Sequence, residues 1–179
     1  MIDLILDFDL SVLKWLDAIR CGFLDGVFGF ITHLGDKGIL WIALGIILIL
    51  TPKYKRAGGC ILLALLINFV AVNLMIKPLV ARTRPYDLVE GINLVISAPH
   101  DYSFPSGHTS AAFATAAAIA FCNKKWGMAA LVLAALIGFS RLYLYVHYPT
   151  DVIAGALLGI GAACIAVRIA DKYRELRSR

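Results

Sequence analysis

Five apolar segments constrain the fold of this chain more than any other feature of its sequence. Residues 57–76, 107–122, 126–146 and 149–170 reach or approach the roughly 17–25 apolar residues that cross a bilayer as a helix. A fifth segment, residues 38–50, is short but can be extended at both ends. We therefore predict an all-α, polytopic transmembrane helical bundle with five to six membrane helices.

The overall composition excludes the soluble alternatives. Of the 179 residues, 60% are apolar and 16% are charged, whereas about a quarter of a typical soluble domain is charged. A soluble globule of this length could not bury so much apolar surface. The same figures exclude a disordered chain, a collagen and a coiled coil. The four cysteines show no metal-type spacing, so we expect free thiols.

The N-terminal segment, residues 1–34, has a different pattern. Polar side chains recur every three or four positions among Leu, Ile, Phe and Trp in residues 2–20, at Asp3, Asp7, Ser11, Lys14 and Asp17. This period predicts an amphipathic helix that lies in the headgroup plane. We divide the chain into an interfacial segment, 1–34, and a single-domain helical core, 35–179. The alternative is a first crossing that includes part of 2–34, kinked at Cys21 and Gly22.

Lysine and arginine side chains predict how the bundle is oriented. The formal net charge is +5, and positive residues gather in segments 51–56, 123–125 and 171–179. Counting crossings places these segments on one face, which the positive-inside rule assigns to the cytoplasm. We expect a multi-pass protein of the cell (inner or plasma) membrane with a cytoplasmic C-terminus and no nucleic-acid partner. The connections 77–106 and 147–148 then lie on the extracytoplasmic face.

Two polar clusters lie at the two ends of the longer connection, and the second extends into the start of the next span. The first comprises Lys77, Arg82, Arg84 and Pro85. Its cations either anchor a helix end by snorkelling or cradle an anion, because arginine forks match phosphate oxygens in pairs. The second comprises Pro105, Ser106, Gly107 and His108. It is either an ordinary helix cap or an anion site, in which exposed backbone N–H groups and the helix dipole face a ligand.

A third cluster follows the segment 126–146 and contains Ser140, Arg141, His147 and Asp151. An arginine near the end of an apolar span is costly, so Arg141 needs a partner or a function. The four-residue spacing lets Asp151 accept the Nδ1–H of His147 and leave Nε2 free as a nucleophile. The alternative is an acidic residue on a helix dipole beside an incidental histidine.

The predicted crossings bring all three clusters to one membrane face. Together they supply three or four cations, a helix N-terminus, two histidines and one carboxylate, without the ligand sets typical of Mg²⁺ or Zn²⁺. Phosphoryl transfer needs mainly charge stabilisation and in-line positioning. We expect a site for phosphoryl transfer that uses no metal and no cofactor. His33 and His100 fall on the same face, and we treat both as structural.

At these residues the sequence resembles the type-2 phosphatidic acid phosphatase superfamily of integral-membrane lipid phosphatases. The family signature reads K-x6-R-P, P-S-G-H and S-R-x5-H-x3-D, and all eleven specified positions occur here in order. The resemblance implies an all-helical bundle, commonly with six crossings, and an enzyme that hydrolyses a lipid phosphate. Its substrate would be a membrane lipid phosphate reached from the bilayer.

The resemblance also implies a role for each matched residue. His147 would attack phosphorus and form a phosphohistidine, oriented by Asp151, and His108 would protonate the leaving oxygen and then activate water. The phosphate oxygens would be bound by Lys77, Arg84, Ser106, Gly107 and Arg141. The supporting residues would be Ser140, Pro85, Pro105 and Arg82. Arg82 lies outside the strict signature, so a salt bridge and a second phosphate contact are both open.

Several substrates are compatible with this site. The short chain and minimal loops favour undecaprenyl diphosphate, hydrolysed to undecaprenyl phosphate in cell-wall biogenesis. The alternatives are a phosphatidylglycerophosphate, phosphatidate or broad-specificity phosphatase in phospholipid metabolism, or a lipid phosphotransferase. The loop 86–104, which contains Asp87, Glu90, His100 and Asp101, is expected to shape the headgroup choice.

Two further hypotheses concern roles other than hydrolysis. A non-catalytic lipid-binding protein would have lost its nucleophile, yet His147, His108 and Asp151 are all present. Gly155 and Gly159 form a GxxxG pair, which we expect to pack within the bundle rather than to form a dimer face. The oligomeric state stays open.

Overall fold

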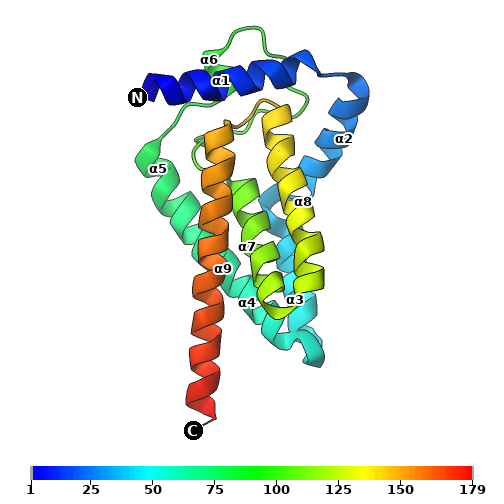
Figure 1. The fold of residues 1–179 in the computed structure, drawn as a ribbon, viewed down its shortest axis with the longest axis vertical. Helices are drawn as coiled ribbons and strands as arrows, with labels where there is room; N and C mark the ends of the chain where they lie inside the picture. The colour runs from blue at the N-terminus through cyan, green and yellow to red at the C-terminus, as the bar shows by residue number, and fades with distance from the viewer. Residues whose placement is uncertain (1, 179) are drawn as a thin grey trace.

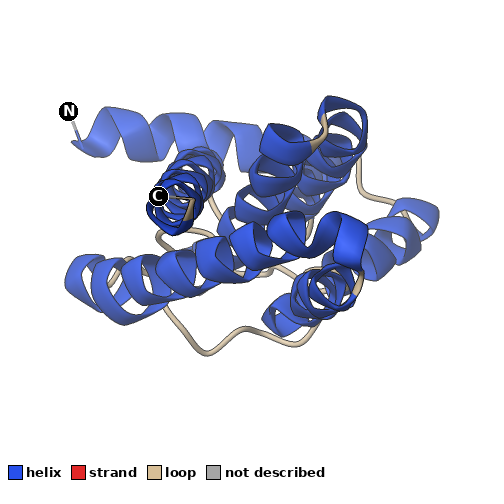
Figure 2. Cartoon of the chain, turned by 90° about the horizontal axis from the view of Figure 1, so that it is seen from below, coloured by secondary structure: helices blue, strands red, loops and turns tan. Residues whose placement is uncertain are grey.

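The computed structural model describes residues 2–178, and every regular element in that range is a helix (Figures 1 and 2). The α-helices are α1 (Ile2–Ala18), α2 (Gly22–His33), α3 (Ile39–Leu50), α4 (Lys55–Asn68), α5 (Lys77–Val80), α6 (Pro85–Leu88), α7 (Gly107–Cys122), α8 (Lys124–Tyr143) and α9 (Pro149–Arg177). Short 3-10 turns η1 (Asp36–Gly38) and η2 (Pro52–Tyr54) and a π-helical stretch η3 (Phe69–Ile76) join them. The predicted all-α class is confirmed.

Four helical stretches are long and apolar enough to cross a membrane: Gly22–Leu50, Pro52–Leu88, Lys124–Tyr143 and Pro149–Arg177. The helix α7 is apolar but shorter, with 16 residues. The first stretch combines α2, η1 and α3, so it begins before residue 35. It agrees with the alternative prediction, in which part of 2–34 belongs to the first crossing. The division of the chain at residue 34 stays a prediction.

The helix α1 lies across one end of the bundle rather than along it (Figure 1). Its inner face buries Leu13 and Leu16 against Tyr145 and Tyr148, which follow α8. Its outer face exposes large apolar side chains, including Trp15. This position brings α1 over the starts and ends of the helices that carry the polar clusters.

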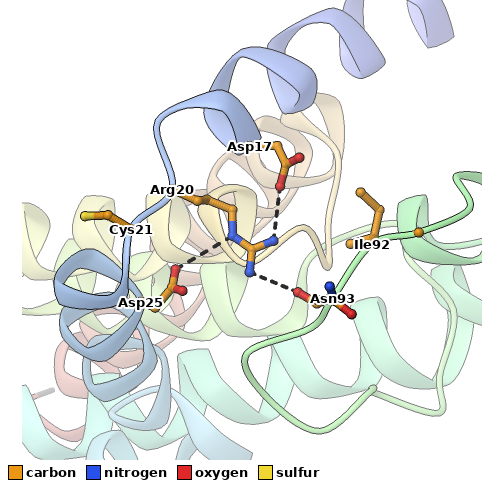
Figure 3. Close-up of a pocket in the computed structure, with 7 residues that line it drawn as sticks. Asp17, Arg20, Cys21, Asp25, Ile92 and Asn93 are labelled. Atoms are coloured by element: carbon orange, nitrogen blue, oxygen red, sulfur yellow. Dashed lines mark hydrogen bonds and ion pairs between the residues drawn. The ribbon is translucent and has the colours of Figure 1, made fainter.

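Arg20 holds the corner between α1 and α2 to the long loop that follows α6 (Figure 3). Its guanidinium donates to Asp17 Oδ1 at 3.1 Å and to the Asn93 carbonyl at 2.9 Å, and its Nε lies 3.7 Å from Asp25 Oδ1. These residues line a cavity of about 280 Å³. The corner therefore joins the N-terminal helices to the loop that covers the site.

The helix α7 forms the centre of the bundle and packs against α4, α8 and α9. It is rich in alanine, which lets a neighbouring backbone approach closely. A Cβ atom on Gly159 of α9 would lie 2.3 Å from the Ser110 carbonyl oxygen, and one on Gly155 would lie 2.7 Å from the Ser106 carbonyl oxygen. The prediction that this glycine pair packs within the bundle is confirmed.

The short length of α7 sets the depth of the site. Its 16 residues span about 24 Å, less than the roughly 30 Å of a bilayer core. The N-terminus of α7 therefore lies below the ends of α8 and α9, under α1 and the long loop (Figure 1). The three polar clusters meet at this end, since Arg82 contacts Asp151 and the Ser106 N–H donates to the Asp151 carbonyl. The C-terminus lies at the other end, with the α3–α4 and α7–α8 connections (Figure 1).

Candidate active site

His147 and Asp151 face each other across the start of α9. The turn after α8 folds back so that the His147 N–H donates to the Arg141 carbonyl at 3.3 Å. Asp151 Oδ2 accepts the Tyr148 N–H at 3.0 Å and lies 3.4 Å from His147 Nδ1. One carboxylate thus caps the helix and contacts the imidazole, and the contact expected from the four-residue spacing is present.

The tautomer of His147 follows from its neighbours. Arg84 Nη1 lies 3.3 Å from His147 Nε2, and a guanidinium can only donate, so Nε2 carries the lone pair and Nδ1 carries the proton. Burial, together with the positive charges of Arg84 and Arg141, lowers the pKa of His147 to about 3, against the opposing effect of Asp151. The ring is therefore neutral at ordinary pH.

Lys77 and Arg84 both donate to Asp101 in the loop after α6. Lys77 Nζ contacts Asp101 Oδ2 and donates to the Tyr102 carbonyl at 3.0 Å. Arg84 Nη2 donates to Asp101 Oδ1 at 2.5 Å, and its Nε donates to the Asp101 carbonyl at 2.7 Å. Partial burial raises the pKa of Asp101, but the two cations outweigh it and bring the pKa to about 2. An ionised carboxylate therefore occupies the donors that the signature assigns to phosphate.

The N-terminus of α7 closes another side of the site. Ser106 caps the helix, and its Oγ accepts the Thr109 N–H at 3.4 Å and the Thr109 hydroxyl at 2.9 Å. Gly107 lies beside the Lys77 stem, since a Cβ atom at Gly107 would be 3.9 Å from Lys77 Cε. The positive end of the helix dipole and the ammonium group are therefore neighbours, as an anion site requires.

His108 has a carboxylate partner that the sequence did not indicate. Its Nε2 lies 2.9 Å from Asp36 Oδ1, and Asp36 Oδ2 lies 2.7 Å from His33 Nδ1. The η1 turn packs closely on this ring, because a Cβ atom on Gly35 would be 2.8 Å from His108 Cδ2. His33, which we interpreted as structural from the sequence, is thus linked to the signature residue His108 through Asp36. The sequence signal for this partner was Asp36 itself, an acidic residue in the break Gly35–Gly38 between two apolar segments.

Arg141 is buried and incompletely bonded. Its Nη1 donates to Thr32 Oγ1 of α2 at 2.5 Å. Its Nε is buried and has no hydrogen-bond partner among residues 2–178. A buried guanidinium N–H without a partner is unfavourable, so this group is available to an incoming oxygen ligand. α2 therefore contributes to the site although no residue of it belongs to the signature.

Arg82 makes two salt bridges. Its Nη1 lies 2.6 Å from Asp151 Oδ1, and its Nη2 lies 2.7 Å from Asp9 Oδ2 in α1. Of the two roles left open by the sequence, the salt bridge is the one that the structure contains. Asp9 was not singled out. The sequence signal for a buried Asp9 was its helical spacing from Leu13 and Leu16, which places a single charge on the apolar face of α1.

The remaining supporting residues pack around these groups. Ser140 Oγ donates to the Ile137 carbonyl at 2.7 Å, Pro85 is the first residue of α6, and Pro105 is buried before Ser106. Ser103, which the sequence did not indicate, donates from Oγ to Asp151 Oδ2 at 2.5 Å. Within residues 2–178, no group of three or more His, Cys, Asp or Glu side chains is arranged to hold a metal ion.

Comparison with known proteins identifies the family of this site. Residues 58–175 match the PAP2 superfamily. The chain belongs to this superfamily. It is therefore a PAP2 membrane lipid phosphatase, a hydrolase with lipid phosphate substrates.

Three similar proteins show the extent of the similarity. An undecaprenyl-diphosphatase of Sulfolobus acidocaldarius is 29% identical over 90% of this chain and 78% of its own. The crystal structure of Aquifex aeolicus LpxE has a TM-score of 0.80, with 31% identity over 90% of this chain and 95% of that one. A transmembrane PAP2-type phosphatidylglycerolphosphate phosphatase from Bacillus subtilis has a TM-score of 0.77, with 28% identity over 93% and 86% of the two chains.

Proposed function

We propose that this PAP2 enzyme hydrolyses a lipid diphosphate, undecaprenyl diphosphate to undecaprenyl phosphate, through a phosphohistidine intermediate. The observation that carries the proposal is the position of the buried His147, whose Nε2 lies 3.3 Å from Arg84 Nη1 and whose Nδ1 lies 3.4 Å from Asp151 Oδ2. In this arrangement a neutral ring keeps its lone pair on Nε2. A nucleophile of this kind needs no general base. Cations and a helix N-terminus surround it, which matches the charge of a transferring phosphoryl group.

In the first half-reaction, Nε2 of His147 attacks the terminal phosphorus and the bond to the bridging oxygen breaks. Asp151 stabilises the positive charge that develops on the ring. Lys77, Arg84 and Arg141 bind the equatorial oxygens, with the Ser106 hydroxyl and the Gly107 N–H at the end of α7. Protonated His108 gives its proton to the leaving lipid phosphate.

In the second half-reaction, His108 takes a proton from water. The hydroxide equivalent attacks the phosphohistidine, the N–P bond breaks, and inorganic phosphate leaves with neutral His147 restored. Asp36 lies 2.9 Å from Nε2 of His108, where its charge favours the protonated ring. The charge stabilisation comes from lysine and arginine, so the proposed chemistry requires no metal and no cofactor.

We also propose five crossings, in which α7 is the short one, and an α1 that lies at the membrane surface. Exposed apolar residues on the outer face of α1 support the second point, and positive connections at the far end of the bundle support a cytoplasmic C-terminus. The site would then open to the extracytoplasmic face. Of the segment 1–34, we propose that α1 is the interfacial part, because the first candidate crossing begins at Gly22, before the predicted core 35–179.

The diphosphate is favoured by similarity to the undecaprenyl-diphosphatase of Sulfolobus acidocaldarius over most of both chains. The alternative is a phosphatidylglycerophosphate, phosphatidate or broad-specificity phosphatase, for which the Bacillus subtilis structure is the supporting observation. Transfer of the phosphoryl group to an acceptor other than water is the third possibility, because a phosphohistidine can serve either reaction.

The test is phosphate release by the purified protein in detergent with EDTA present. Undecaprenyl diphosphate, phosphatidylglycerophosphate and phosphatidate are compared, and His147→Ala is the control for the nucleophile. We expect a strong preference for the diphosphate and no activity in the variant. Comparable rates on the monoesters would assign the enzyme to phospholipid metabolism. Loss of activity in EDTA with recovery in Mg²⁺ would overturn the mechanism for any substrate.

A further inference from the structure

We propose that Asp9 of α1 is a positioning residue for phosphoryl transfer, which acts through Arg82 on Asp151 and so on His147. The inference rests on the proposed role of His147. It concerns a helix that lies outside the matched family region, residues 58–175. It also gives α1 a function beyond attachment to the membrane surface.

The geometry is a chain of direct contacts. Arg82 Nη2 donates to Asp9 Oδ2 at 2.7 Å, and Arg82 Nη1 donates to Asp151 Oδ1 at 2.6 Å. The guanidinium carbon lies 3.8 Å from the centre of the Tyr148 ring, which supports the planar group from one face. The other oxygen of Asp151 contacts His147 Nδ1. Arg82 thus fixes the rotation of the carboxylate that orients the nucleophile.

The charges explain why a second carboxylate is needed. Asp9 and Asp151 are both fully buried, and Arg82 is largely buried between them. Arg82 paired with Asp151 alone would neutralise the carboxylate that must stabilise a cationic His147 during transfer. With Asp9 included, the group of three keeps one net negative charge. Because the surroundings are desolvated, that charge is felt strongly at the imidazole.

Asp9 also has a structural contact, which the test must separate from this role. Its Oδ1 accepts the Thr150 N–H at 3.1 Å, and its Oδ2 accepts the Thr150 hydroxyl at 2.6 Å. It therefore caps the first turn of α9 from another helix. Asp9→Asn retains an oxygen that can accept the Thr150 N–H but removes the charge that faces Arg82. Docking of α1 through Leu13 and Leu16 is unaffected by this change.

The experiment compares Asp9→Asn with Asp7→Asn, which removes an exposed carboxylate from the same helix. We expect kcat of Asp9→Asn to fall roughly 10- to 100-fold, the effect of losing one hydrogen bond between charged groups. We expect KM to change less than about twofold, because Asp9 does not touch the phosphate site. Rapid-quench measurement should locate the loss in formation of the phosphohistidine. Asp7→Asn should match the parent protein in all three measurements.

A double-mutant cycle tests the path through Arg82. If Asp9 acts through Arg82, then Asp9→Asn should cause no further loss of kcat in an Arg82→Gln background. Arg82→Lys, which keeps the charge but cannot bond both carboxylates as a fork, is the second variant and should also lower kcat with little change in KM. It keeps the proposal testable if Asp9→Asn does not fold.

Three outcomes would overturn the proposal: full kcat in folded Asp9→Asn, losses that add independently in the double variant, or a loss confined to thermal stability. These results are distinct from failure of the proposed function. If phosphate release by the parent protein does not depend on His147, the phosphohistidine mechanism fails before any variant of Asp9 is measured.

Discussion

Arg84 and Asp101 are joined twice, once through the side-chain carboxylate at 2.5 Å and once through the backbone carbonyl at 2.7 Å. Lys77 contacts the other carboxylate oxygen. A substrate phosphate that uses these two cations must therefore displace the Asp101 carboxylate. Because the pKa of Asp101 is lowered to about 2, the competing group stays ionised throughout the working pH range.

The first prediction concerns this competition. Asp101→Asn removes the competing charge, so the inhibition constant of orthovanadate, a phosphate analogue, should fall by about tenfold. Asp87→Asn, which removes an exposed acid of α6 just before that loop, is the matched control and should leave the constant unchanged. A higher inhibition constant of orthovanadate for Asp101→Asn would mean that Asp101 positions the two cations to bind phosphate and does not compete with phosphate for them.

The second prediction concerns the pH dependence of kcat/KM. The histidine pair predicts a bell-shaped profile, with a neutral nucleophile and a protonated acid. Burial and the charges of Arg84 and Arg141 lower the pKa of His147 to about 3, so its neutral form persists well below the ordinary value of 6.5. The rate at about pH 5 should therefore remain near its maximum, whereas an unshifted histidine would be mostly protonated there. An acid limb centred near 6.5 would contradict the prediction.

The third prediction concerns the contact between Asp36 and His108. Asp36→Asn removes the charge that supports protonated His108, so turnover of a lipid phosphate should fall about tenfold. The loss should be smaller with p-nitrophenyl phosphate, whose leaving group needs little protonation. Lys37→Gln is an exposed neighbouring control. Equal losses on both substrates would show that Asp36 does not act through the leaving-group step.

The fourth prediction concerns packing of α9 on α7. Gly159→Ala would place a Cβ atom 2.3 Å from the Ser110 carbonyl oxygen and should destabilise the bundle by about 1–3 kcal/mol or more. Gly161→Ala lies on the same helix with no atom within 4 Å of the new Cβ atom. It should change stability by less than about 1 kcal/mol. The fraction of monodisperse protein that remains after heating in detergent distinguishes the two variants.

The sequence alone determined the class of fold and which signature residues meet in the candidate site. Runs of apolar residues long enough to span a bilayer leave the backbone few choices other than helices, because no water is present to bond its polar groups. Helices that fold back on one another bring alternate connections to the same end. The three signature clusters were therefore predictable as one site, and the pairing of His147 with Asp151 follows from helix spacing at the start of α9.

The tertiary structure decided which carboxylates contact the residues of that candidate site. Asp9 reaches Arg82 across 73 residues of sequence, and Asp36 reaches His108 across 72. Local periodicity places a charge on a face of its own helix, but it does not say which distant segment will cover that face. The position of α1 across the end of the bundle and the turn at η1 supply these partners. Both depend on how whole helices pack, so no local pattern could predict them.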